Sequence, residues 1–146
     1  MKLAITLTLL LLALAGSVTA QEKSVDFGEY QVHYAVFPSI FLPPEVAAAN
    51  NLNRSKGIGI VNIAIMTERD NGGIRTVPGQ VEGKALNDVG QPSFLAFRRI
   101  QEGDAVYFIA EYQYSAGELM TFQITARPSG HAQDLPIRFS QALFND

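Results

Sequence analysis

Three side chains of the types used in nucleophilic catalysis lie near one another in the sequence: His33, Ser39 and Glu45. A serine becomes a nucleophile when a histidine takes its proton and a carboxylate orients that histidine. Ser39 could meet His33 across the end of a strand, although the Gly-x-Ser-x-Gly turn of many serine hydrolases is absent from the sequence. A small hydrolase or ligand carrier that uses these residues is the alternative hypothesis, and a non-enzymatic binding protein is the leading one.

A compact basic segment, Arg54-Ser55-Lys56, follows these residues. It could bind an anion or an acidic peptide. It could equally be a solvated loop that pairs loosely with Glu45, because surface ion pairs are common and individually weak.

Metal and cofactor sites are poorly supported. The chain has two histidines, His33 and His131, which are far apart in the sequence, and it has no cysteine. A structural zinc site needs four nitrogen or sulfur ligands at short spacings, so this composition excludes one. Gly57-Ile58-Gly59 lacks the third glycine of a phosphate-binding loop and precedes a strand. We therefore expect no cofactor.

The overall charge argues against one class of partner. With a formal net charge of −3, the chain offers no basic surface for a nucleic-acid backbone. The 47% of apolar residues is typical of a globular protein. We expect the partner to be another protein or a peptide, and a periplasmic one because of the secretory signal pattern in the first twenty residues.

The first twenty residues have the pattern of a secretory signal. Lys2 precedes an apolar run over 3–15, and Val18-Thr19-Ala20 places small residues at a cleavage site. As a helix, thirteen residues would span about 20 Å of a hydrocarbon core about 30 Å thick, which is too short for an anchor. The sequence predicts cleavage after Ala20, export to the periplasm, no membrane span afterwards, and a single domain over 21–146.

Alternation of apolar and polar residues dominates the rest of the chain. This period of two, interrupted by Gly, Asn, Asp and Pro, is typical of antiparallel strands. The predicted strands are 29–37, 57–67, 80–86, 95–100, 105–114, 119–126 and 137–143. A further strand should leave the Asp70–Gly73 turn near Arg75, and Gly83 could mark a bulge. The pattern predicts an all-β, antiparallel β-sandwich of immunoglobulin-like character, with a small barrel as the alternative.

One segment instead has the pattern of a short helix. Residues 43–50 begin with two prolines, carry Glu45 in the first turn and continue with three alanines. Asn50 stands where a left-handed cap would end the helix. We expect a helix of at most two turns after the first strand.

Several apolar residues occupy strand faces that a simple sandwich would leave in water, namely Ile58, Ile60, Met66, Tyr107 and Ile109. They could form a protein-binding surface, or the helix and the 37–44 connection could cover them. A third possibility is a peptide that adds a strand to an exposed sheet edge.

Adjacent Arg98 and Arg99 should point to opposite faces of their strand, because successive strand residues alternate. An arginine directed toward the core needs a partner, so one of the two could be structural.

Several motifs together resemble a known family. They are Val32-His33-Tyr34, Ser39, Phe41-Leu42, Pro44-Glu45-Val46-Ala47, Arg54-Ser55-Lys56, Gly59 to Ile63, Phe97-Arg98 and Glu102-Gly103. The sequence resembles a family of small bacterial exported proteins that is classified as a domain of unknown function. The resemblance implies a periplasmic protein and supplies no catalytic residue.

The matching positions cluster in the first strand, the short helix and the basic loop. If the protein has a site, we expect it where these residues could converge: His33, Ser39, Glu45, Arg54, Ser55, Lys56 and Asn62. The competing interpretation is that Pro44, Glu45 and Arg54 only fix the crossover between two strands, by capping and ion pairing.

Overall fold

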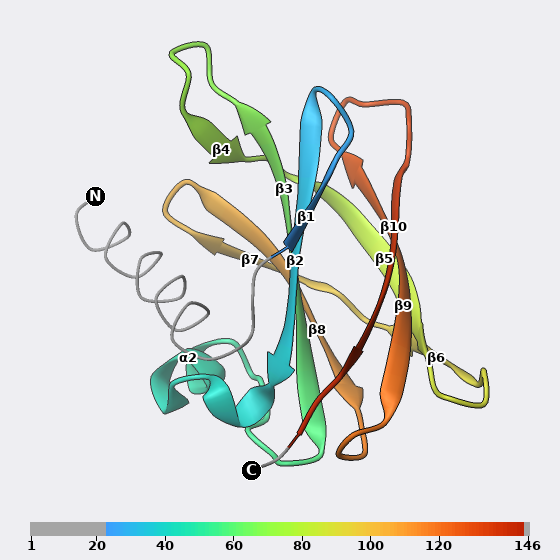
Figure 1. The fold of residues 1–146 in the computed structure, drawn as a ribbon. Coiled ribbons are helices and arrows are strands. Elements are labelled where there is room, and N and C mark those ends of the chain that lie inside the picture. Colours follow the sequence, from blue (N-terminus) through green and yellow to red (C-terminus); the bar gives the residue numbers. More distant parts are fainter. Residues whose placement is uncertain (1–22, 145–146) are drawn as a thin grey trace.

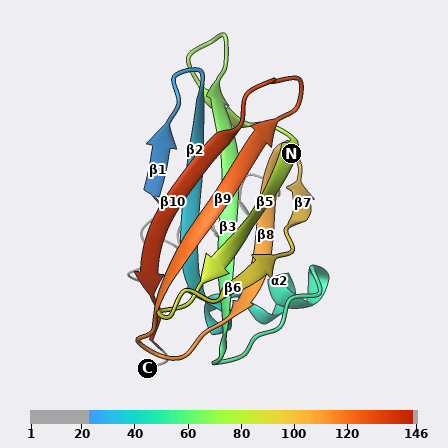
Figure 2. The ribbon, with the colours of Figure 1, turned by 90° about the vertical axis from the view of Figure 1, so that its right-hand side faces the viewer.

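The computed structural model describes residues 23–144, and within them it has two antiparallel sheets packed face to face (Figure 1). The large sheet contains β1 (Lys23–Asp26), β2 (Tyr30–Pro38), β3 (Ile58–Glu68), β8 (Ala105–Gln113) and β7 (Arg98–Glu102) in that order, with β4 (Ile74–Thr76) also paired to β3. The small sheet contains β10 (Leu135–Ala142), β9 (Leu119–Pro128), β5 (Gly79–Leu86) and β6 (Pro92–Leu95). Figure 2 shows the two layers one behind the other. The predicted antiparallel β-sandwich is confirmed.

The main difference in the strands concerns the predicted strand 95–100. Leu95 ends β6 in the small sheet, and Arg98 begins β7 in the large sheet. The prediction of one continuous strand was therefore wrong, because the chain crosses between the sheets at Ala96 and Phe97. The described part of the chain holds ten strands. β4 is the strand expected near Arg75, whereas β1 and β6 were not predicted as separate strands.

The core between the sheets is rich in stacked aromatic rings. Phe122 is fully buried, and its ring centroid lies 5.0 Å from those of Tyr112 and Phe139. Phe139 in turn stacks on Tyr34 at 4.1 Å. Alternate residues of β8 face this core, namely Val106, Phe108, Ala110 and Tyr112.

Tyr112 is buried in an unusual way. Its ring lies directly over Gly59, where a Cβ would be 2.5 Å from the ring. Its hydroxyl oxygen is buried and has no hydrogen-bond partner among residues 23–144. Burial, and secondarily the neighbouring Tyr114, raises the pKa of Tyr112 well above that of a free tyrosine. The phenol therefore stays neutral in the folded protein.

A second, smaller cluster covers the outer face of the large sheet. Ile60 and Ile109 are buried there against Leu42, Ala47 and Leu52, which come from the connection between β2 and β3. The covering interpretation is therefore confirmed for these two residues. The other three, Ile58, Met66 and Tyr107, are half-buried.

The connection contains a 3-10 turn, η1 (Ser39–Phe41), and the helix α2 (Pro44–Ala49). The predicted short helix is confirmed, with Pro44 as its first residue, although it follows the second strand of the chain. The prediction that Asn50 takes the left-handed conformation at the end of the helix was wrong. Its φ is −114°, and its side-chain Nδ2 donates to the Val46 carbonyl at 2.9 Å, so the positive φ falls one residue later, at Asn51 (54°).

The predicted signal and its cleavage after Ala20 lie outside the described residues. Within residues 23–144, no helix has the length and apolar character needed to cross a membrane.

Candidate functional site

The three residues of the hydrolase hypothesis do not come together. His33 lies in the middle of β2, with Nε2 3.3 Å from Gln31 Oε1. Ser39 follows the end of that strand, and six residues of extended chain separate the two by about 20 Å. Glu45 is exposed in the first turn of α2. The proton transfer from Ser39 to His33 that this hypothesis requires has no geometric basis.

Ser39 is instead fully buried and bonded to the backbone of the basic loop. Its Oγ donates to the Ser55 carbonyl at 2.9 Å and accepts from the Ser55 N–H at 2.8 Å. Both roles of the hydroxyl are thus used in holding two chain segments together.

Arg54 has a similar structural role. Its Nε donates to the Leu42 carbonyl at 2.8 Å and its Nη2 to the Ile40 carbonyl at 3.0 Å. The guanidinium therefore ties the basic loop to the chain between η1 and α2. These bonds fit the interpretation that Arg54 fixes the crossover, although through carbonyl oxygens and not through Glu45.

The remaining candidates lie apart from this clamp. Lys56 is exposed in the turn before β3. Asn62 lies on β3, paired with Ala35 and Ile109, and its Oδ1 is buried without a partner among residues 23–144. His33 pairs with Ala64 on the same face, so His33 and Asn62 are diagonal neighbours on the outer side of the large sheet. The structure thus brings together Arg54, Ser55 and Ser39 and leaves the other four residues outside.

We expect Arg54→Ala to lower the free energy of unfolding by about 1 to 2 kcal/mol, because two carbonyls lose a charged donor. Urea unfolding followed by circular dichroism measures the change. The exposed Lys56→Ala is the matched control and should stay within about 0.5 kcal/mol of wild type. Equal stability of the two variants would contradict this structural role of Arg54.

A neighbouring network, absent from the predicted set, holds the end of α2. Arg98 Nη1 donates to the carbonyls of Asn50 and Asn51, each at 2.9 Å, and Nη2 lies 3.3 Å from Glu111 Oε1. Glu111 Oε2 accepts from the Asn53 N–H at 2.9 Å. The adjacent pair Arg98-Arg99 was the signal in the sequence. Arg98 is the structural one, and its partners lie on the outer side of the sheet.

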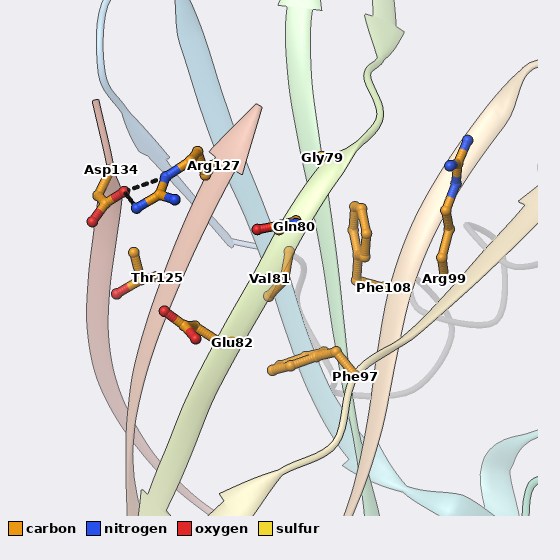
Figure 3. Close-up of a pocket in the computed structure, with 10 residues that line it drawn as sticks. All are labelled: Gly79, Gln80, Val81, Glu82, Phe97, Arg99, Phe108, Thr125, Arg127 and Asp134. Carbon is orange, nitrogen blue, oxygen red and sulfur yellow. Dashed lines mark hydrogen bonds and ion pairs between the residues drawn. The ribbon is translucent and has the colours of Figure 1, made fainter. Parts of the chain in front are cut away.

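Arg99 instead lines an open cavity of about 380 Å³ beside β5 and β7, with lining residues from both sheets (Figure 3). The aromatic part of the lining comes from Phe97 and the buried Phe108. Other lining residues are Gly79, Gln80, Val81, Glu82, Thr125, Arg127 and Asp134. These lining residues form no polar cluster in the sequence, so the sequence motifs did not indicate this site.

The cavity exists because β6 is too short to cover β5. β6 pairs only with Gly83 to Leu86, and the chain then crosses to the large sheet. Among the strands of residues 23–144, Gly79 to Glu82 of β5 therefore have a neighbour, β9, on one side only. This stretch is therefore an open sheet edge, whose backbone N–H and C=O groups can pair with another chain.

Two residues of this edge, Gly79 and Val81, direct their backbone N–H and C=O groups toward the cavity. In an antiparallel ladder, the N–H and C=O of alternate residues point to opposite neighbours. The Asn87 N–H donates to the Gln91 carbonyl at 3.1 Å, which shows that odd-numbered residues of this hairpin face the β6 side. The Ser129 N–H donates to the Pro78 carbonyl, so even-numbered residues face β9. Gly79 and Val81 thus direct their backbone groups to the open side.

The two arginines that line the cavity differ in their partners. Arg127 is paired with Asp134, through Nε at 2.6 Å and Nη2 at 2.5 Å from the same carboxylate oxygen. Arg99 makes one described side-chain hydrogen bond within residues 23–144, from Nη2 to the neutral amide oxygen of Gln101 at 3.3 Å. Arg99 is therefore positioned to bind a negatively charged group. Residues 23–144 contain no cluster of three or more His, Cys, Asp or Glu side chains that could hold a metal ion.

Comparisons with known proteins give the family and the fold. A DUF4426 family protein from Pseudomonas aeruginosa PAO1 is 34% identical, with a TM-score of 0.75 over 86% of this chain and 96% of that one. A copper-bound variant of FetP from uropathogenic Escherichia coli strain F11 is 12% identical, with a TM-score of 0.61 over 84% and 95% of the two chains. FetP of the same strain as isolated, after recombinant expression in the periplasm of E. coli BL21(DE3), is 13% identical, with a TM-score of 0.57 over 82% and 93%. The two FetP structures share the fold of this chain.

The search of curated proteins found no match. The profile described as "Domain of unknown function (DUF4426)" matches residues 24–146. This match spans most of the chain and agrees with the identity to the Pseudomonas protein. It also confirms the resemblance that the sequence motifs indicated. The chain therefore belongs to the DUF4426 family, a family defined by a domain of unknown function.

Proposed function

We propose that this protein is a non-enzymatic periplasmic binding module that takes up an extended segment of another protein or a peptide as an added strand on β5. The observation that carries the proposal is the open edge of Gly79 and Val81, whose backbone N–H and C=O groups face the cavity. An extended segment can satisfy such groups with its own backbone, which is the mode of peptide recognition by strand addition.

The cavity supplies what the backbone alone cannot. Backbone hydrogen bonds give affinity with little selectivity, whereas a pocket beside the edge selects one side chain of the added strand. Phe97 and Phe108 offer an apolar seat, and its volume of about 380 Å³ is at the lower end of small-ligand pockets. An apolar or aromatic side chain of the partner fits this seat.

The signal pattern at the start of the sequence supports a periplasmic setting. The fold-related FetP was expressed in the periplasm, which agrees with that setting. The copper of the FetP variant does not extend to this chain in the proposal, because residues 23–144 lack a set of clustered metal ligands. The distance between His33 and Ser39 argues against the hydrolase alternative.

A proline at position 81 tests the proposal. Val81→Pro removes the N–H that faces the open side and leaves the ladder to β9 intact, because proline is tolerated where an edge N–H faces solvent. Twelve-residue peptides selected from a phage-displayed random library against the exported chain are the probes. We expect them to bind Val81→Pro at least tenfold more weakly than wild type, by fluorescence anisotropy.

Val81→Ala is the matched control, because it shortens the same side chain and keeps the N–H. We expect it to bind the peptides within about threefold of wild type, since less than 1 kcal/mol separates such affinities. Equal affinity of Val81→Pro and Val81→Ala for every selected peptide would overturn strand addition at β5. So would a library that yields no binder.

A further inference from the structure

We infer that the segment bound at the β5 edge carries a carboxylate, and that Arg99 binds it. This inference rests on the proposed function and adds the chemistry of the ligand. A guanidinium presents five N–H donors in a planar fork that matches the two oxygens of a carboxylate. Within residues 23–144, one of these donors is used, in a 3.3 Å hydrogen bond to the Gln101 amide.

The other charged residues of the cavity leave Arg99 as the cation available to a ligand. Arg127 has its carboxylate already, since Nε and Nη2 both bond Asp134. Glu82 alternates with Val81 on β5 and points to the outer face of the small sheet, beside Thr125. In Figure 3, Glu82 and the Arg127–Asp134 pair lie on one side of β5, whereas Arg99 and Phe108 lie on the other.

The position of Arg99 relative to the aromatic seat defines the ligand more closely. Arg99 is directly paired with Phe108 across β7 and β8, so both side chains leave the same face of the large sheet. A strand added to β5 would place a side chain against Phe97 and Phe108 and bring a neighbouring acidic group within reach of Arg99. The expected ligand is an extended peptide with an apolar anchor and an adjacent carboxylate.

Such a carboxylate could be the C-terminus of the peptide or the side chain of an Asp or Glu. The peptides selected for the strand-addition test distinguish these sources when each is made with an amidated C-terminus, and separately with Asn or Gln replacing its acids. We expect the change that removes the contacting carboxylate to weaken binding to wild type about tenfold or more.

Arg99→Gln is the matching change in the protein. We expect it to weaken binding of the acidic peptide about tenfold and to abolish the difference between the acidic and the neutralised peptide, as a double-mutant cycle requires. Arg138→Gln is the control, because Arg138 is an exposed arginine of β10 outside the cavity lining, and it should stay within about threefold of wild type. Urea unfolding of Arg99→Gln should match wild type, because the side chain is exposed.

The outcomes separate the two proposals. If Val81→Pro weakens binding but Arg99→Gln does not, the carboxylate inference is overturned and strand addition stands. The inference is also overturned if Arg99→Gln weakens acidic and neutralised peptides equally. If Val81→Pro leaves binding unchanged, the proposed function itself fails.

Discussion

Phe122→Ala should lower the free energy of unfolding by about 3 to 5 kcal/mol, the range for removing a large buried aromatic side chain. Phe122 is 0% exposed and lies at the centre of the small sheet, paired with Ala85 and Phe139. Its ring contacts those of Tyr112 and Phe139, so both would lose a packing partner. The cavity left behind cannot close, because backbone ladders on both sides hold β9 in place.

The effect is large relative to the stability of a typical domain, about 5 to 15 kcal/mol. The chain has no tryptophan, so urea unfolding is best followed by circular dichroism. Phe94→Ala is the matched control: the same residue type is 85% exposed on β6, and its truncation should cost less than about 0.5 kcal/mol. A loss at position 122 no larger than that at position 94 would contradict the observed packing.

The alternation of residues predicted most of the strands because burial on one face leaves a direct trace in the sequence. It also showed apolar residues on the second face of β3, and one of the two explanations given for them, a cover by the helix and the 37–44 connection, holds for Ile60. The same reasoning failed at Leu95 to Ile100, because the apolar residues Leu95 to Phe97 span the point where the chain changes sheets. Alternation reports which face is buried and carries no information about which sheet buries it.

The predicted convergence of seven site residues is met only by three of them. Ser39, Arg54 and Ser55 do cluster in space, as the motifs suggested, but their polar groups bond the backbone of the chain itself. A side chain that binds its own backbone and one that binds a ligand look the same in one sequence. The cavity at β5 was missed because it depends on where β6 ends, which is a property of the sheet pairing.

Gly83→Ala is expected to cost about 2 to 3 kcal/mol, the upper part of the range of about 1 to 3 kcal/mol for overpacking a well-packed core. Gly83 marks no bulge, contrary to the expectation from the sequence, because it pairs in unbroken register with Ile124 on one side and Leu95 on the other. A Cβ there would lie 2.6 Å from the Gln123 carbonyl oxygen and 2.9 Å from the Ile124 Cα. These are backbone atoms of the neighbouring strand, so relief requires β5 and β9 to move apart.

The comparison that isolates this contact is Gly57→Ala, where the nearest atom to a Cβ is the Tyr114 carbonyl oxygen at 4.0 Å. We expect Gly57→Ala to stay within about 0.5 kcal/mol of wild type in urea unfolding. Amide hydrogen exchange should further show faster exchange along the β5–β9 ladder in Gly83→Ala alone. Equal stability of the two variants would mean that β5 does not approach β9 this closely. Gly83 adjoins the unpaired stretch of β5, and peptide binding there requires β5 to be held firmly against β9. The same variant should therefore also bind the selected peptides more weakly than wild type.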